Sequence, residues 1–253
     1  MTEPNLIQWL VLAIIQGLTE YLPISSSAHL ILVSRLMNWQ DQGLVMDIAA
    51  HGGSLLAVLW YFKAELKKLF IGKNWDLFIK LALASIPLAV FGYVFKDYIE
   101  SSLRSNTLVF AVSSIVFGLL LYLSDIVQKN KTTQSKPKKI NLKQAVIIGF
   151  AQVCALIPGA SRSGVTMSAA MGMGFNRTKA ANFSFLMAIP ALLMTTAYGV
   201  LKLIKEPSNY HVMGIIIVFT VSFITSLLSI KLFLKLIEQI PICLLYTSPS
   251  PRD

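Results

Sequence analysis

Five long apolar stretches dominate this sequence, and they constrain the fold more than any other feature. Each has about 20 residues with few charges, which is the length that an α-helix needs to cross the hydrocarbon core of a bilayer. Only 13% of the residues are charged and the mean hydropathy is +0.66, whereas a soluble domain carries about 25% charged residues. Backbone groups inside a membrane must be bonded within the chain, which favours helices. We therefore predict an all-α polytopic membrane protein with spans at residues 45–62, 77–95, 108–127, 183–203 and 212–234.

The net charge of +10 gathers in loops between the apolar stretches. Lysines cluster in residues 63–73 and 128–143, and such loops carry the charge that sets the orientation of a membrane protein. No basic stripe is interleaved with aromatic residues, which argues against nucleic-acid binding. Cys154 lies in an apolar segment and Cys243 in the tail, so the two cysteines indicate no disulfide framework.

The first apolar segment is too short and too polar for a simple crossing. Gln16 and Glu20 lie four positions apart and so share one face of a helix. Pro23 ends that helix, and the serines at positions 25–27 can cap a second one of about ten residues. Ten residues cannot cross a bilayer. We therefore predict a re-entrant hairpin over residues 6–37, with its serine-rich tip buried inside the protein.

The second half of the chain repeats this layout. A short helix containing Gln152 is followed by the breaker Pro158-Gly159, a Ser-Arg-Ser tip and another short helix. We therefore divide the chain into a first repeat (1–127, hairpin 6–37 and three spans), a cytoplasmic linker (128–141) and a second repeat (142–242, hairpin 142–174 and two spans).

The number of spans predicts how the two hairpins are oriented. Each hairpin returns to its own side, and three spans separate them, so they enter from opposite faces of the membrane. This indicates an inverted-topology repeat whose two tips, at residues 23–29 and 158–166, meet near the midplane. The positive-inside rule places the lysine-rich loops in the cytoplasm.

The last eleven residues, CLLYTSPSPRD at 243–253, differ in character from the rest of the chain. They look like the translation of a sequencing-library adaptor, and we exclude them from the fold. On this interpretation a last helix of the second repeat is missing.

Polar groups at the two tips predict a phosphate site. The guanidinium of Arg162 matches phosphate oxygens, and an arginine in lipid without a partner costs about 2.5 kcal/mol or more. Backbone amides at the start of a helix also attract anions. The other expected phosphate-binding residues offer hydroxyls or backbone amides: Ser25, Ser27, Gly159, Ser161, Ser163, Gly164 and Thr166.

Three residues of the first tip suggest chemistry. Glu20 would help to hold a divalent cation that bridges a diphosphate. His29 follows Ser26 by three positions on a starting helix, within reach as general base or as nucleophile.

Other interpretations of these residues stay open. A single serine in a membrane helix often bonds back to a backbone carbonyl, and Glu20 alone is also compatible with a buried, protonated acid. For His51 and Asp47, near a membrane face, we expect a supporting or merely interfacial role. An inverted repeat with re-entrant tips is also a transporter layout, so a transporter or flippase of a lipid phosphate is the alternative function.

Two sequences carry a family resemblance. QGLTEYLPISSSAH at 16–29 and PGASRSGVT at 158–166 resemble the signature motifs of the undecaprenyl-diphosphate phosphatases, the bacitracin-resistance protein family, and the resemblance extends over residues 1–242. It implies hydrolysis of undecaprenyl diphosphate to undecaprenyl phosphate and inorganic phosphate, at a site that opens to the outer side of a bacterial plasma membrane. This reaction recycles the lipid carrier of cell-wall synthesis and confers bacitracin resistance. With this resemblance, the transporter or flippase alternative would move a polyprenyl phosphate lipid.

The resemblance also implies a divalent cation, Mg²⁺ or Ca²⁺, and catalytic roles for Glu20, Ser26, His29 and Arg162. The family's first motif has Glu or Gln at the position of Gln16. The metal ligand is therefore Glu20, with Gln16 as a second candidate, and the chain has one carboxylate fewer than a Glu-containing motif. The nucleophile stays open among Ser26, His29 and an activated water, and a homodimer is left open as well.

Overall fold

The computed structural model describes residues 6–39, 43–71, 75–103, 106–132, 139–205 and 211–237. All regular structure in these residues is helical, which confirms the predicted all-α fold. Three parts of the prediction lie outside the described residues. They are the adaptor-like tail at 243–253, the expectation that a last helix is missing, and the linker at residues 133–138.

Five helices are long and apolar enough to cross a membrane, and each overlaps one of the five predicted spans. They are α3 (Leu44–Tyr61), α5 (Trp75–Tyr98), α6 (Thr107–Thr132), α9 (Arg177–Lys205) and α10 (Val212–Leu236). A short helix with lysines, α4 (Lys63–Phe70), connects α3 to α5, and a π-helical turn (Ile99–Leu103) follows α5. The chain is a multi-pass membrane protein by the length and composition of these helices.

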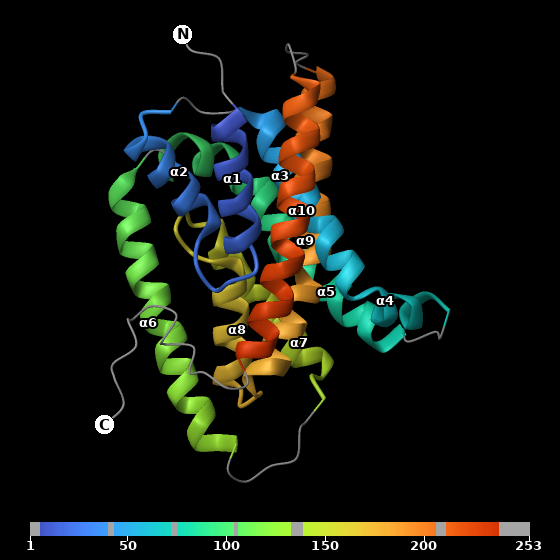
Figure 1. Cartoon of the computed structure of the whole chain (residues 1–253). Helices are drawn as coiled ribbons and strands as arrows, with labels where there is room; N and C mark the ends of the chain where they lie inside the picture. Colours follow the sequence, from blue (N-terminus) through green and yellow to red (C-terminus); the bar gives the residue numbers. More distant parts are fainter. Residues whose placement is uncertain are drawn as a thin grey trace, which may run out of the picture.

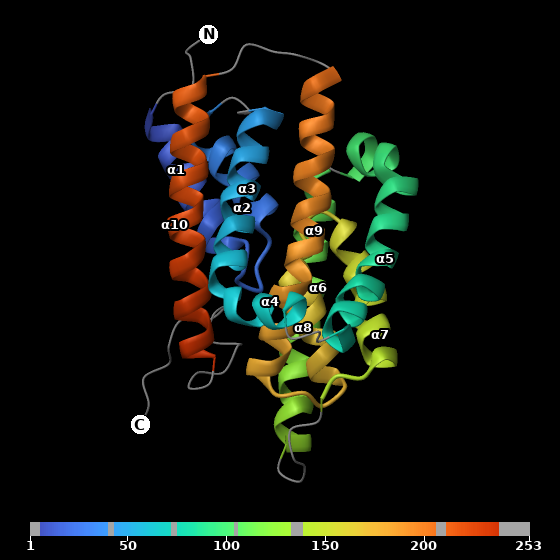
Figure 2. The ribbon, with the colours of Figure 1, turned by 90° about the vertical axis from the view of Figure 1, so that its right-hand side faces the viewer.

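Four shorter helices form two hairpins. These are α1 (Leu6–Thr19) with α2 (Ser26–Leu36), and α7 (Leu142–Gln152) with α8 (Arg162–Gly172), the latter joined through a 3₁₀ turn at Val153–Leu156. Figure 1 shows that α1 and α2 enter from one end of the molecule and α7 and α8 from the other, and Figure 2 shows the same from the side. The connecting loops meet inside the helical bundle. That each hairpin enters and leaves the membrane on the same side stays a prediction.

The long helices hold the hairpins in place by close packing. Helix α3 lies against α10 and α9, and α1 also lies against α10. At Gly53 the two backbones approach so closely that a Cβ atom would lie 2.3 Å from the carbonyl oxygen of Phe219, so a side chain there would push α10 away from α3. Phe185 and Met187 of α9 are fully buried at the centre of the main core. Helix α9 therefore forms the inner wall of the bundle.

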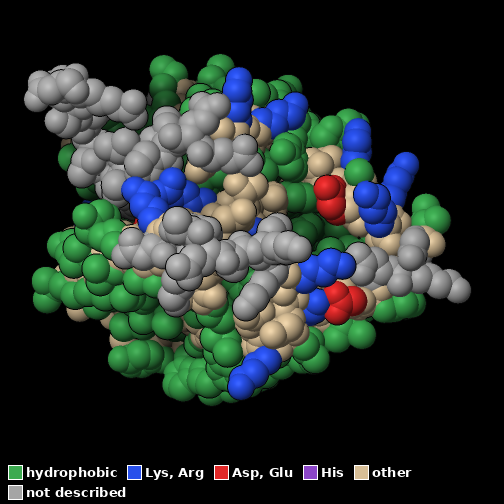
Figure 3. All heavy atoms as spheres, turned by 90° about the horizontal axis from the view of Figure 1, so that it is seen from below, with side chains coloured by type: hydrophobic (Ala, Val, Ile, Leu, Met, Phe, Trp, Pro, Cys, Tyr) green, Lys and Arg blue, Asp and Glu red, His purple; other side chains and the backbone are tan. Residues whose placement is uncertain are grey.

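Basic side chains gather at one end of the molecule. Figure 3 shows lysines and arginines on the lower end, where α3, α6 and α10 finish and α7 and α9 begin. Here Arg177 forms a two-pronged ion pair with the buried Asp125 of α6, with nitrogen–oxygen distances of 2.5 and 2.7 Å. The helix ends that flank the lysine-rich loops, those of α3, α4, α6 and α7, thus lie at the same end of the fold, as the count of spans predicted.

Candidate active site

The loop between α1 and α2 is fixed by hydrogen bonds of its own and by α3. Ser25 caps α2, its hydroxyl oxygen accepting from the amide of Ala28 at 3.3 Å. Tyr21 is fully buried, and its hydroxyl donates to the carbonyl oxygen of Ser54 on α3 at 2.6 Å. The loop therefore cannot move without breaking a buried bond to a spanning helix.

The loop between α7 and α8 is fixed in the same way against α6. Ser161 caps α8 by accepting from the amide of Gly164 at 3.2 Å. Gly159 has a φ of 94°, a conformation that side chains disfavour, and a Cβ atom here would lie 2.2 Å from the hydroxyl oxygen of Ser113. That hydroxyl donates to the carbonyl oxygen of Pro158 at 2.5 Å. The Pro-Gly breaker thus turns the chain tightly against α6.

The two loops touch each other, as the inverted repeat predicted. The hydroxyl of Ser163 donates to the carbonyl oxygen of Leu22 at 2.6 Å, across 141 positions of sequence. Ser161 and Ser163 also share a hydrogen bond of 3.0 Å. Hydroxyls of the second loop therefore satisfy backbone groups of the first, which matters where water is scarce.

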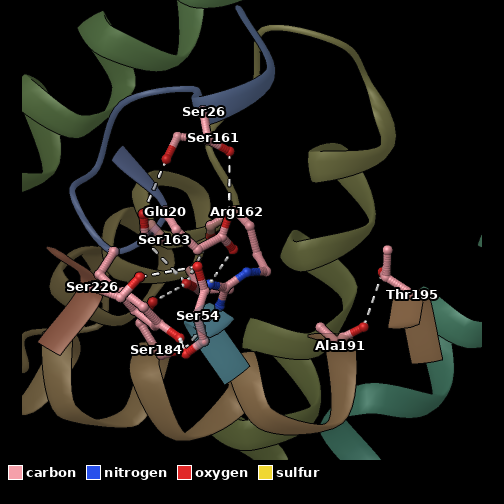
Figure 4. Close-up of polar contacts among 12 residues, drawn as sticks. Glu20, Ser26, Ser54, Ser161, Arg162, Ser163, Ser184, Ala191, Thr195 and Ser226 are labelled. Atoms are coloured by element: carbon pink, nitrogen blue, oxygen red, sulfur yellow. Dashed lines mark hydrogen bonds and ion pairs between the residues drawn. The ribbon is translucent and has the colours of Figure 1, made fainter. Parts of the chain in front are cut away.

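A buried ion pair lies at this contact (Figure 4). Arg162 Nη2 lies 3.2 Å from Glu20 Oε1, and the two side chains are 13% and 7% exposed. The other carboxylate oxygen, Oε2, accepts from Ser26 Oγ at 3.2 Å and from Gln16 Nε2 at 2.9 Å. Arg162 Nη1 also donates to the carbonyl oxygen of Ser184 at 3.3 Å. Opposite charges at this distance attract each other, which offsets part of the cost of burying the two side chains.

A cavity of about 530 Å³ opens beside the pair. Its polar part contains six of the residues expected from sequence: Glu20, Ser25, Ser26, Ser27, Ser161 and Arg162. Apolar residues of α5 and α9, among them Leu88 and Leu192, form its walls, and Tyr93, Lys96 and Tyr198 lie near the ends of these helices away from the lysine-rich end. A polar end with long apolar walls suits an anionic headgroup attached to a lipid.

The remaining candidates lie around the cavity and do not line it. Gly159 and Gly164 shape the second loop, and Ser163 binds the first. Thr166 is fully buried and shares a 2.7 Å hydrogen bond with Ser184, so it supports the residue that Arg162 contacts. His29 is half-buried, with Nδ1 lying 2.7 Å from the carbonyl oxygen of Ser25.

Sequence reasoning missed several cavity residues. His51 of α3 lines the cavity, although the sequence suggested only a supporting or interfacial role. The sequence feature that could have pointed to a functional role for His51 was a histidine inside an apolar run. The residues of α5 and α9 gave no motif, because their part in the cavity depends on how two distant spans pack.

The described residues can supply two oxygen ligands to a divalent cation. No group of three or more His, Cys, Asp or Glu side chains gathers anywhere in them. However, Gln16 Oε1 is buried without a hydrogen-bond partner in the structure, while Gln16 Nε2 bonds to Glu20. Mg²⁺ is commonly held by one or two carboxylates together with substrate phosphates. Glu20, at the cavity, fits such a site, which the substrate would complete. Gln16 Oε1 would join it after a turn of the side-chain amide, since Nε2 now faces Glu20.

Known proteins have sequences related to this one along most of the chain. The family model described as "Bacitracin resistance protein BacA" matches residues 9–246. A protein of Campylobacter concisus named undecaprenyl-diphosphatase is 42% identical over 246 residues, covering 91% of this chain and 90% of its own length. A protein of the same name from Colwellia psychrerythraea is 44% identical over 249 residues, with the same coverage. "Undecaprenyl-diphosphatase 2" of Stutzerimonas stutzeri is 43% identical over 253 residues, covering 93% and 91%. The chain therefore belongs to the bacitracin resistance protein BacA family.

Proposed function

We propose that this protein is a membrane phosphatase that hydrolyses undecaprenyl diphosphate to undecaprenyl phosphate and inorganic phosphate. The observation that carries the proposal is the Glu20–Arg162 pair with Ser26 at the polar end of a cavity with apolar walls. The relatives' names give the same reaction. Such an enzyme would recycle the lipid carrier of cell-wall synthesis and confer bacitracin resistance.

Arg162 is the residue we assign to the terminal phosphate. Its contacts to Glu20 and Ser184 use one Nη1–H and one Nη2–H bond, and a guanidinium has five N–H donors. Arg162 is also the first residue of α8, where free amides and the helix dipole attract an anion. Hydroxyls of Ser25, Ser27 and Ser161 complete the phosphate-binding set. These donors would stabilise charge on the transferred phosphoryl group.

Ser26 and a water molecule both fit the role of nucleophile. The Ser26 hydroxyl donates to Glu20 Oε2 and faces the cavity, the arrangement of a nucleophile beside its base. A water in the cavity would find the same carboxylate within reach. His29 has its ring held against the carbonyl oxygen of Ser25 at the start of α2, and its role as general base or nucleophile stays a prediction.

A divalent cation, Mg²⁺ or Ca²⁺, is part of the proposal. When bound, it would neutralise the diphosphate and draw negative charge from the phosphoryl oxygens. Glu20, with Gln16 Oε1, would hold it. Arg162 would keep the carboxylate oriented in the absence of substrate.

The cavity walls and the charge pattern support a lipid substrate entering from the outer side. The first units of a polyprenyl chain would lie against Leu88, Ala89 and Leu192, gaining about 0.8 kcal/mol for each CH₂ that stays out of water. Lys96 and Tyr198 lie at the end opposite the lysine-rich loops. If those loops are cytoplasmic, the cavity opens outward in a bacterial plasma membrane. A homodimer stays a prediction.

The experiment compares hydrolysis with transport. The purified chain in proteoliposomes is given undecaprenyl diphosphate, with inorganic phosphate measured in one assay and lipid transfer between leaflets in another. Phosphate release that stops with EDTA and returns with Mg²⁺ is the expected result. A folded protein that moves the lipid between leaflets without releasing phosphate would instead support the flippase alternative.

A further inference from the structure

The cavity contains a histidine that neither signature motif includes. His51 lies on α3 and lines the same cavity as Glu20, Ser26 and Arg162. His29, the histidine of the first motif, is not among the cavity residues. Within the described chain, His51 is therefore the imidazole placed to meet a bound diphosphate.

The ring of His51 is held in one orientation. Nδ1 lies 2.7 Å from the carbonyl oxygen of Asp47, one turn earlier on α3. A carbonyl oxygen only accepts hydrogen bonds, so Nδ1 carries the proton in this contact. In the neutral ring Nε2 is then the acceptor, and it is the polar atom that His51 can offer to the cavity.

The helix that carries His51 is fixed beside the reacting groups. Ser54, three residues further on, shares its face of α3 and accepts from Tyr21, the neighbour of Glu20, at 2.6 Å. The hydroxyl of Ser226 on α10 donates to Ser54 Oγ at 3.0 Å. Figure 4 shows Ser54 beside the Glu20–Arg162 pair. His51 is thus held one helical turn from the point where α3 is joined to the catalytic loop.

We propose that His51 is a further catalytic residue, whose Nε2 accepts a hydrogen bond from the water that attacks the terminal phosphorus. This proposal rests on the proposed function. The water oxygen bonds to the terminal phosphorus while the bridging P–O bond breaks. The lipid phosphate leaves with the electron pair of that bond, and both hydrogens of the water end on the released inorganic phosphate.

The geometry of His51 supports one contribution to catalysis, which is to orient the attacking water. The transition state of phosphoryl transfer is loose, so catalysis depends mainly on positioning and on stabilising charge. A nucleophile displaced by about 1 Å can cost 10²-fold in rate. An amide oxygen at the same distance from the backbone can replace Nε2 as acceptor, whereas a shorter amide or an alkyl group cannot.

The test uses three substitutions of His51 in the full chain, assayed for phosphate release from undecaprenyl diphosphate. His51→Leu and His51→Asn should lower kcat about 10²-fold with KM within about threefold of wild type, and His51→Gln should keep kcat within about tenfold. His211→Gln is the matched control, because His211 is exposed at the start of α10, against Trp9. It should behave as wild type.

Three results overturn the proposal. They are unchanged kcat in His51→Asn, equal losses in His51→Gln and His51→Asn, and a loss that appears only in KM. If His51→Leu does not fold, the Gln and Asn variants still decide, because both keep a polar group at this position. A folded wild-type protein that releases no phosphate would instead contradict the proposed function itself.

Discussion

Glu20 and Arg162 lie 142 positions apart in the sequence, and their side chains form a 3.2 Å ion pair where the two hairpin loops meet. Each residue comes from a different half of an inverted arrangement, so neither half alone contains the site. The pair also satisfies two charges that would be costly in this environment if either stood alone. The site is therefore complete only when the two hairpin loops are packed together.

Replacing Ser26 tests how much its hydrogen bond to Glu20 contributes to the rate of phosphate release. Ser26→Ala removes the hydroxyl that donates to Glu20 Oε2 and faces the cavity. We expect kcat for phosphate release to fall at least 10²-fold, since a nucleophile or an orienting donor is lost. Ser124→Ala is the control, because its exposed hydroxyl bonds only within α6 in the described structure. Equal activity of the two variants would remove Ser26 from the mechanism.

The proposed cation site is tested by adding a second carboxylate to it. Gln16→Glu places a second acid on α1 next to Glu20, which follows the end of that helix four residues later. A second carboxylate should lower the Mg²⁺ concentration that gives half-maximal phosphate release, because Mg²⁺ prefers oxygen ligands of negative charge. EDTA should abolish release in both proteins. If the variant needs as much Mg²⁺ as wild type, Gln16 does not approach the cation.

The turn at Gly159 is predicted to be intolerant of a side chain. Gly159→Ala would place a Cβ atom 2.7 Å from the carbonyl oxygen of Phe110, in a residue whose φ is 94°. The carbonyl oxygen of Phe110 belongs to the backbone of α6, which moves only at the cost of helix geometry. The loop that carries Arg162 must therefore shift instead. We expect at least a 10²-fold fall in kcat, because phosphoryl transfer depends on positioning.

The control for this turn is Gly118, a glycine inside α6. A Cβ atom at Gly118 meets nothing within 4 Å, and alanine favours a helix by roughly 1 kcal/mol relative to glycine. Gly118→Ala should therefore keep its activity and melt at an equal or higher temperature. Full activity in Gly159→Ala would show that the loop geometry described here is not required.

The Asp125–Arg177 pair is predicted to act on stability rather than on catalysis. Asp125 is 2% exposed and joins α6 to the start of α9, far from the cavity residues. Asp125→Asn leaves the guanidinium without its charged partner, which costs about 3 kcal/mol for a buried pair. Thermal unfolding in detergent should show a melting temperature several degrees lower, with kcat per folded protein unchanged. The exposed Asp97→Asn serves as control, and equal melting of both variants would contradict this.

The sequence was sufficient for the helices and for the meeting of the two tips. Apolar length located the five spans. The parity of those spans implied that residues 23–29 and 158–166 approach from opposite ends, as the ribbon in Figure 1 shows, and the Ser163–Leu22 bond joins the two loops. The residues of the cavity walls could not be predicted from the sequence. Leu88 and Leu192 look like any lipid-facing leucine until α5 and α9 are packed around the loops. His51 and the Ser113–Pro158 bond likewise depend on contacts between distant helices.

One measurement tests the central claim most directly, namely that the Glu20–Arg162 contact is a phosphatase site. It is the kcat for inorganic phosphate release from undecaprenyl diphosphate in wild type and in Arg162→Lys. Lysine keeps the positive charge but loses the planar fork that contacts Glu20 and Ser184. We predict a fall in kcat of about 10²-fold or more in a protein that remains folded. Equal kcat in the two proteins would contradict the account.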